Sequence, residues 1–272
     1  IKELSQDSAA HVIYIDKDNE EFSFVQSHEE LTKYVKSNLL SNKRNYLFVD
    51  EIQNIKEFEV SLRSFHTNDE CEMVITGSNA KMLSSELSTY LSGRCVEYHI
   101  QSLDYREFLT FHRLSDNNQS LHSYLKYGGL PQLHRIGLEE TELVDDYLKS
   151  VYHTIVLKDV IEREEIRNVP LLKNLIRFVG DNVGKVFSAS SIVKYLKSQQ
   201  VDSSTRVILN YLEYLCNAYI INRVNRYDIH GKRLFELNDK FYFEDIGIRN
   251  SLVASGRSSS MEKVIENVIY LH

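Results

Sequence analysis

Short apolar runs alternate with helical stretches through the first hundred residues of this chain. Such runs, rich in β-branched and aromatic side chains, are typical of strands that are buried on both faces of a sheet. Between the first two runs, Ser27 is followed three residues later by Glu30, a spacing that predicts the start of a helix. Strands separated by helices favour βαβ units, so we expect a parallel sheet covered by helices on both faces. The four runs span residues 11–15, 46–49, 72–76 and 95–100.

The pattern changes near residue 103. Residues 103–170 show helical periodicity without a strand-like run, and Pro131 follows a Gly-Gly pair at a position that suits the first turn of a new helix. Three helices followed by a β-hairpin come next, which is the order of elements in a winged helix. The helices are expected at 171–182, 188–199 and 203–217, and the strands at 219–227 and 234–237.

The charge and the cysteines exclude several classes of protein. The net charge is −7, and the first 110 residues hold 11 Lys and Arg against 19 Asp and Glu, whereas residues 181–250 hold 10 against 8. An acidic chain of this kind does not coat nucleic acid, so the mildly basic third segment is the candidate nucleic-acid surface. Three well-separated cysteines favour a reducing compartment, and we expect the cytoplasm. No apolar run approaches the ~20 residues that span a bilayer, so no membrane partner is expected.

The sequence Tyr46-Leu-Phe-Val-Asp-Glu-Ile52 carries the strongest chemical signal. A buried strand that ends in Asp50 and Glu51 delivers two carboxylates to the carboxyl edge of a parallel sheet, where open α/β folds bind their ligands. This is the pattern of a Walker B motif. Asp50 would hold Mg²⁺, which prefers oxygen ligands, and Glu51 would polarise the water that attacks the γ-phosphate of ATP. The alternative is a strand that ends in two solvated acids.

Polar residues near the next two strands extend this interpretation. Ser78 and Asn79 follow the third run, where ring-type ATPases present a polar side chain to the attacking water and the γ-phosphate. Arg94 stands just ahead of the fourth run, where an arginine can stabilise charge on the transferred phosphoryl group, in its own subunit or in a neighbouring one. For Arg94 the alternative is a surface ion pair.

A series of short motifs in a defined order covers nearly the whole chain. The chain resembles prokaryotic AAA-type ATPases of uncertain cellular role, in which an ATPase core is followed by a helical part, a winged helix and a PD-(D/E)XK nuclease-like domain. The resemblance implies a parallel-sheet P-loop NTPase fold of the AAA type, with ATP and Mg²⁺ as cofactors. The motifs are Asp-Glu-Ile-Gln-Asn at 50–54, Ile-Thr-Gly-Ser-Asn-Ala at 75–80, Leu-Ser-Ser-Glu-Leu at 83–87, Leu-Ser-Gly-Arg at 91–94, Ser-Leu-Asp-Tyr-Arg-Glu-Phe at 102–108, Tyr-Gly-Gly-Leu-Pro at 127–131, Asp159 to Arg163, Tyr-Leu-Glu-Tyr-Leu at 211–215, Lys-Phe-Tyr-Phe-Glu-Asp-Ile-Gly at 240–247 and Glu-Asn-Val at 266–268.

The phosphate-binding loop of such ATPases, G-x-x-x-x-G-K-[ST], is absent from the 272 residues. Gly180-Asp-Asn-Val-Gly-Lys185 has three residues between its glycines and is followed by Val186, so we interpret it as a helix stop. The resemblance implies that the loop and its central strand lie before Ile1, and that the nuclease-like domain follows His272. We therefore expect ATP hydrolysis by this chain to be weak or absent, and we assign it no nuclease site.

The predicted winged helix and the helical part carry further candidates. The polar residues of the third helix of the winged helix form one narrow stripe with a single arginine, and such a stripe is a poor reader of the major groove. The hairpin is richer in basic residues, which could contact DNA phosphates. The candidate DNA contacts are Arg206, Arg223, Arg226, Lys232 and Arg233. The alternative is a structural or regulatory module packed on the ATPase. The Gly-Gly-Leu-Pro element at 128–131 also resembles the Gly-x-Pro motif of related signalling ATPases, which implies that Pro131 contacts adenine. Here the alternative is a plain helix stop and restart.

These observations predict an α/β chain with four parts. They are an AAA-type ATPase core without its Walker A unit at 1–102, a helical lid at 103–170, a winged helix at 171–254 and the start of a truncated further domain at 255–272. The predicted function is ATP binding and hydrolysis, with self-association as a further expectation. The alternative is a non-enzymatic winged-helix protein, DNA-binding or regulatory, on an ATPase-like scaffold.

Overall fold

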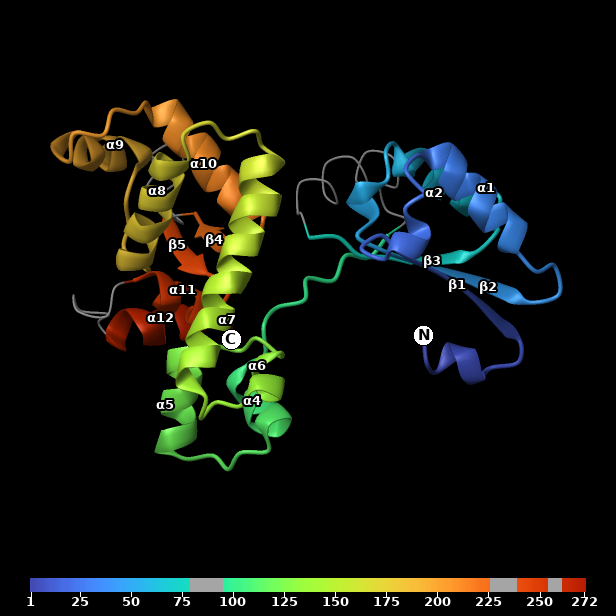
Figure 1. The fold of residues 1–272 in the computed structure, drawn as a ribbon, viewed down its shortest axis with the longest axis horizontal. Helices are drawn as coiled ribbons and strands as arrows, with labels where there is room; N and C mark the ends of the chain where they lie inside the picture. The colour runs from blue at the N-terminus through green and yellow to red at the C-terminus, as the bar shows by residue number, and fades with distance from the viewer. Residues whose placement is uncertain (79–94, 226–238, 254–260) are drawn as a thin grey trace, which may run out of the picture. The chain divides into compact units, whose positions relative to one another are not determined.

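The computed structural model describes residues 1–78, 95–225, 239–253 and 261–272. The chain divides into two compact units, Ile1–Tyr98 and His99–His272 (Figure 1). This division lies close to the boundary at residue 102 that the sequence predicts. Within the described ranges, none of the helices combines the length and the apolar character that crossing a membrane requires.

The first unit contains a three-stranded parallel sheet in the order β1-β2-β3. Each strand is linked to the next through a helix, as the sequence pattern predicts for βαβ units. Helix α1 begins with the expected capping contact, because the Glu30 carboxylate accepts the backbone N–H of Ser27 at 3.0 Å. The elements are η1 (Leu4–Gln6), β1 (Ala10–Asp16), η2 (Glu20–Phe22), α1 (His28–Asn38), β2 (Arg44–Asp50), η3 (Ile52–Asn54), α2 (Phe58–Thr67) and β3 (Glu72–Ile75).

Helices α1 and α2 cover one face of this sheet (Figure 1). Alternate strand residues such as Ile13, Ile15 and Leu47 are buried in the core on that side. On the opposite face Tyr14 and Val74, which flank Phe48 in the register, are 41% and 49% exposed. Among the described residues, helices therefore cover one of the two faces on which the sequence predicts them. Two right-handed crossovers that step in the same direction across a sheet place both helices on the same side.

Residues 95–100, the fourth predicted strand, form no strand. The alternating apolar side chains Val96, Tyr98 and Ile100 are 75%, 80% and 85% exposed. A strand needs a neighbour that pairs with its backbone N–H and C=O groups, and no strand of the described residues pairs with this segment. The local period is that of a strand, but the period alone does not supply a pairing partner.

The second unit begins with helices only, as predicted for residues 103–170. These are α4 (Tyr105–His112), α5 (Asn118–Tyr127), α6 (Leu133–Ile136), α7 (Thr141–Thr154) and its π-helical continuation η5 (Ile155–Glu162).

Three more helices then lead into an antiparallel pair of strands, in the predicted order. The predicted run at 234–237 lies outside the described residues, and the second strand of the pair, β5, begins at Lys240. The elements are α8 (Val169–Asp181), α9 (Ala189–Ser198), α10 (Thr205–Asn217), β4 (Ile221–Val224), β5 (Lys240–Phe243), α11 (Ile246–Leu252) and α12 (Met261–Leu271).

One apolar core joins α7, η5, α8, α9, α10, β4 and β5. The segments predicted as a helical lid and a winged helix thus both lie in the second unit and share this core. Helix α12 belongs to the same unit. The fully buried side chain of Asn267 accepts the N–H of Phe243 and donates to its carbonyl oxygen, both at 2.8 Å. Glu266 accepts hydrogen bonds from Lys240 Nζ at 2.8 Å and from the Tyr242 hydroxyl at 2.9 Å. Residues 261–272, expected to start a further domain, thus pack on β5.

Two of the short sequence motifs, more than a hundred residues apart, pack on each other. The buried Asp245 carboxylate accepts the N–H of Gly129 at 2.8 Å and caps α11 through the N–H of Ile248 at 2.9 Å. Burial raises the pKa of Asp245, and these donors oppose that shift. Gly128 has a φ of 76°, and a Cβ there would lie 2.4 Å from Asp245 Oδ1. A Cβ on Gly129 would lie 2.1 Å from the carbonyl oxygen of Leu103. The Gly-Gly pair is therefore required by close packing.

Candidate functional site

The carboxyl ends of the three parallel strands meet at one edge of the first unit. Asp16 and Asp50 end β1 and β2 and are partners in the register. In the next pair Val49 lies opposite Ile75, so Thr76 stands level with Asp50 at the same edge. Asp50 is therefore flanked by Asp16 on one side and Thr76 on the other, at the place where α/β sheets bind ligands.

Thr76 organises the turn that follows β2. Its N–H donates to the carbonyl oxygen of Val49 at 2.9 Å, and its own carbonyl oxygen accepts the N–H of Ile52 at 3.0 Å. Its hydroxyl donates to Oδ1 of Asp50 and accepts the N–H of Glu51 at 3.3 Å. A hydroxyl has one donor and two acceptor sites, so both contacts form together. The sequence interpretation assigned Thr76 no role, and the signal that could have found it is the register of β2 and β3.

Glu51 has a left-handed backbone, with φ 55° and ψ 48°. This conformation costs about 1–2 kcal/mol for a residue with a Cβ, and the contacts of Thr76 offset that cost. Oε2 of Glu51 accepts hydrogen bonds from Gln53 Nε2 and, at 3.3 Å, from Ser78 Oγ. Gln53 Nε2 also donates to Ser78 Oγ at 3.1 Å. The structure thus brings together Glu51 and Ser78, which the sequence predicts, and adds Gln53, which reaches back over Glu51 because η3 is a tight turn.

The side-chain atoms at this edge that could bind a metal ion are oxygens. Asp50 offers a carboxylate and Thr76 a hydroxyl, which fit Mg²⁺, because Mg²⁺ in phosphate-transfer sites takes one or two carboxylates and completes its shell with water and phosphate oxygens. Among the described residues no group of three or more His, Cys, Asp or Glu side chains could hold a metal alone. Asn79 and Arg94, predicted to face the same phosphate, lie outside the described residues.

The negative charge at this edge acts on Tyr14. This side chain lies on the same face of β1 as Asp16, two residues before it. Desolvation, followed by the carboxylates of Asp16 and Asp50, raises the pKa of Tyr14. Two carboxylates that disfavour a third negative charge favour a cation for the same reason.

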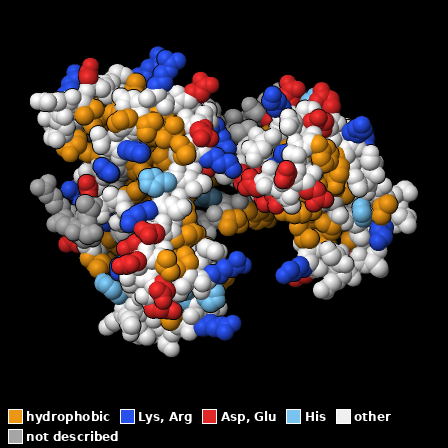
Figure 2. All heavy atoms as spheres, in the orientation of Figure 1, with side chains coloured by type: hydrophobic (Ala, Val, Ile, Leu, Met, Phe, Trp, Pro, Cys, Tyr) orange, Lys and Arg blue, Asp and Glu red, His pale blue; other side chains and the backbone are white. Residues whose placement is uncertain are grey.

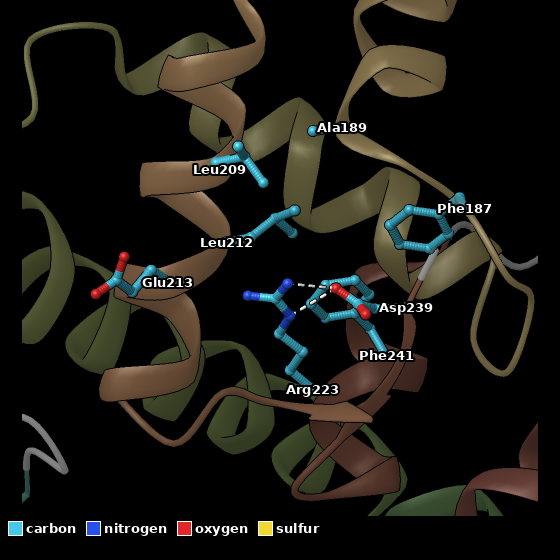
Figure 3. Close-up of a pocket in the computed structure, with 8 residues that line it drawn as sticks. All are labelled: Phe187, Ala189, Leu209, Leu212, Glu213, Arg223, Asp239 and Phe241. Carbon is cyan, nitrogen blue, oxygen red and sulfur yellow. Dashed lines mark hydrogen bonds and ion pairs between the residues drawn. The ribbon is translucent and has the colours of Figure 1, made fainter. Parts of the chain in front are cut away.

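The candidate DNA contacts in the second unit are partly described. Arg206 lies in the first turn of α10 and is exposed. Asn210 and Glu213, which belong to the same polar stripe of this helix, are exposed as well. On β4, Arg223 is paired, because its Nε and Nη2 lie 2.6 Å and 2.5 Å from Oδ2 of Asp239 (Figure 3). A phosphate contact by Arg223 would have to replace this partner. Outside the described residues lie Arg226, Lys232 and Arg233.

The surroundings of Arg223 do not form a ligand-sized pocket. The cavity beside the ion pair has a volume of about 20 Å³ and is lined by apolar side chains that include Leu212 and Phe241 (Figure 3). That is room for about one water molecule. On the face seen in Figure 2, Lys and Arg side chains of the second unit are scattered among acidic and apolar ones.

Pro131 is exposed in the turn between α5 and α6. The Gly-Gly pair ahead of it is explained by packing on Asp245, so the helix stop and restart accounts for the motif without a ligand. The adenine contact of Pro131 remains a prediction.

Two sequence families match the chain. Residues 1–109 match a family described as an AAA domain, and residues 118–259 match a family described as a domain of unknown function, DUF8612. The first match contains the edge with Asp50 and Glu51. The second covers more than half of the chain and most of the second unit.

The chain is similar to longer proteins from a bacterium and an archaeon. An uncharacterised protein of Haemophilus influenzae is 30% identical over 271 residues, which are 97% of this chain and 66% of that protein. An uncharacterised protein of Methanocaldococcus jannaschii is 28% identical over 256 residues, which are 89% of this chain and 56% of that protein. The chain thus spans slightly less than two thirds of the first relative and little more than half of the second.

A solved structure has the same fold. The Walker-type ATPase of Pyrococcus abyssi superposes with a TM-score of 0.57 at 13% identity, covering 89% of this chain and 83% of that one. The likeness confirms the α/β, parallel-sheet fold of P-loop ATPases that the sequence predicts.

Proposed function

The chain belongs to the DUF8612 family and carries an AAA domain ahead of that region, and on this premise we propose that it is part of an ATPase that binds ATP with Mg²⁺ and hydrolyses it. The observation that carries the proposal is the carboxyl edge of the sheet. Asp50, Glu51, Thr76 and Ser78 converge there through hydrogen bonds. P-loop ATPases place a metal-holding acid and a water-positioning group at this edge.

Each residue of the edge has a proposed role. Asp50 would hold Mg²⁺, which when bound neutralises charge on the β- and γ-phosphates, and the hydroxyl of Thr76 fixes the orientation of the Asp50 carboxylate. Glu51 would accept a proton from the attacking water. Ser78 and Asn79 would contact the γ-phosphate. Arg94 would stabilise charge on the transferred group, in its own subunit or across a self-associated pair.

We propose that polypeptide outside the 272 residues supplies the phosphate-binding loop. Two observations on the first unit support this. Among the described strands, β3 pairs only with β2, which leaves backbone groups on its other edge for a further strand. The sheet face that carries Tyr14 and Val74 is apolar and half exposed, which suits a covering helix. A strand, loop and helix would satisfy both.

The test is ATP turnover in a polypeptide that carries a phosphate-binding loop ahead of Ile1. We expect Mg²⁺-dependent phosphate release by that polypeptide and weak or no release by the 272-residue chain. Glu51→Gln should lower kcat by about 100-fold or more, because a positioned general base contributes at least that much. Glu21→Gln, at an exposed position of the same unit, is the matched control. Equal turnover in Glu51→Gln and in the unsubstituted protein would refute the proposal.

For the second unit we propose a winged helix with a structural or regulatory role rather than DNA recognition. The order of α8, α9, α10, β4 and β5 supports a winged helix. The pairing of Arg223 with Asp239, and the single arginine on the exposed stripe of α10, favour the structural role. Titration of a DNA duplex at two salt concentrations tests it. A salt-dependent complex that Arg206→Gln weakens would contradict the structural role.

A further inference from the structure

The second unit begins at His99, and the side chain of this residue is held by two segments that are distant in the sequence. Its ring stacks on the phenol ring of Tyr219, in the turn between α10 and β4, with the ring centroids 4.9 Å apart and an interplanar angle of 28°. Its Nε2 lies 3.3 Å from Oε1 of Glu244, which follows β5. Just ahead of His99, the side chains of Val96 and Tyr98 are 75% and 80% exposed. His99 therefore fastens the start of the second unit.

The next fastened residue along the chain is Ser102. Its hydroxyl donates to the backbone carbonyl oxygen of Glu244 at 3.2 Å, a contact that does not depend on the charge of any side chain. Between His99 and Ser102, the side chain of Ile100 is 85% exposed. Release of His99 would therefore free residues 99–101 and leave the chain fastened from Ser102 onward.

The carboxylate of Glu244 takes its counter-charge from His99. The side chain of Glu244 is 12% exposed, and burial raises its pKa, whereas the positive charge of His99 and then a hydrogen bond from Asn222 act in the opposite direction. Oε1 of Glu244 is buried and accepts no hydrogen bond of regular geometry from the described residues. The 3.3 Å contact with His99 is therefore an attraction between charges rather than an aligned hydrogen bond, and a neutral imidazole would lose most of it.

The other titratable groups that act on Glu244 among the described residues do not replace His99. Asp245, the next residue, adds negative charge and raises the pKa of Glu244 further. Burial raises the pKa of the Cys216 thiol on α10 to about 12, and burial also raises the pKa of the Tyr270 hydroxyl on α12, so both groups are neutral near neutral pH. Because none of these groups carries positive charge, protonated His99 is what offsets the burial of the Glu244 carboxylate.

We propose that His99 and Glu244 form a pH-sensitive latch at the start of the second unit, which opens when His99 loses its charge and frees residues 99–101. Histidine side chains change charge between about pH 5 and 8. Because the pKa of Glu244 is raised, the cost of burying its charge appears as the pH rises through that value, and protonated His99 offsets this cost. Once the pH rises further and His99 is neutral, the buried carboxylate has no counter-charge, and separation from His99 lets water reach it. The freed residues lengthen the exposed connection between the two units by about 10 Å, independently of any ATPase activity.

The first experiment follows the motion of residues 99–101 in the 272-residue chain. The heteronuclear ¹H–¹⁵N NOE of their backbone amides is recorded between about pH 5 and 8, together with the ring resonances of His99. We expect the NOE values to fall as the pH rises, with a midpoint at the pH where the ring of His99 titrates. NOE values that do not change with pH would overturn the proposal.

Two variants sharpen this measurement. His99→Phe keeps a ring that can stack on Tyr219 and has no charge, so the NOE values of residues 99–101 should be low at every pH. His122→Phe, at an exposed position of α5, is the matched control and should keep the profile of the unsubstituted chain. High NOE values in His99→Phe would show that stacking alone holds the segment and would overturn the latch.

The second experiment changes the partner of His99 and leaves the released segment intact. Chymotrypsin cleaves after tyrosine and needs an extended chain on both sides of the bond, so cleavage between Tyr98 and His99 reports the population of the open latch. At about pH 6.5 we expect Glu244→Gln to be cleaved there about fivefold faster than the unsubstituted chain, because the variant lacks one partly buried ion pair. At about pH 8.5 the latch is open in both proteins, and the difference should disappear.

Glu142→Gln, at an exposed position of α7, is the matched control for the cleavage assay and should leave the rate unchanged. Equal cleavage of Glu244→Gln and the unsubstituted chain at the lower pH would overturn the latch. The NMR measurement on His99→Phe carries the test where Glu244→Gln does not fold.

Discussion

Asn267 on α12 offers a direct test of how the second unit is held together. Its amide group pairs with both backbone groups of Phe243, as a neighbouring strand would, and it has no exposed surface. Asn267→Leu keeps the number and branching of the side-chain heavy atoms and leaves the N–H and the C=O of Phe243 buried without a partner. Each orphaned group costs about 1–3 kcal/mol, so we expect local stability to fall by about 2–4 kcal/mol after the gain from the apolar side chain.

The assay is hydrogen–deuterium exchange at the Phe243 amide, followed by NMR. Exchange at one amide is preferable to a global melt, because a chain with two units does not unfold in a single step. Since 1.4 kcal/mol corresponds to a factor of ten, the exchange of the Phe243 amide should accelerate about 30-fold or more. Asn210→Leu, at an exposed position of α10, is the matched control and should leave the rate unchanged. An acceleration below about threefold in Asn267→Leu would refute the reasoning.

Three further outcomes are expected. Gly129→Ala should destabilise the second unit by about 3 kcal/mol, because the new Cβ would lie 2.1 Å from a backbone oxygen, and an unchanged urea midpoint would contradict this. Burial raises the pKa of the Cys216 thiol to about 12, so at pH 8 iodoacetamide should modify the exposed Cys95 and leave Cys216 intact, with the Cys216 rate rising as the pH approaches that pKa; mass spectrometry reads both sites. Ser204→Ala should cost about 1 kcal/mol, because the Ser204 hydroxyl caps α10 by accepting an N–H at 3.3 Å, whereas Ser203→Ala should have little effect on thermal unfolding.

The candidate site could be predicted only in part. Asp50 and Glu51 are recognisable because a short apolar run followed by two acids has a defined place in a parallel sheet. Thr76 and Gln53 are not recognisable in this way. The role of Thr76 depends on which residue of β3 lies opposite Val49, and the contact of Gln53 with Glu51 depends on the tight turn of η3. Neither property follows from composition or periodicity.

The fold, like the candidate site, could be predicted only where local sequence patterns determine it. The short strands and most helices follow from local patterns, including the capping spacing of Ser27 and Glu30. The strand expected at 95–100 does not form, although its period is correct, because no described strand pairs with it. The position of α12 on β5 also could not be predicted, because it depends on hydrogen bonds between Asn267 and Phe243, which are 24 residues apart in the sequence.

The sequence by itself determined the parallel βαβ order, the helical character of residues 103–170 and the two acids at the end of β2. These properties depend on side-chain periodicity, capping and turn residues, which act over a few residues. Tertiary structure alone decided which sheet face the helices cover, which side chains hold Glu51 and Asp50, and how the helices and the β4-β5 pair share one core. These depend on the direction of crossovers, on strand register and on hydrogen bonds between distant segments, and a local pattern contains none of that information.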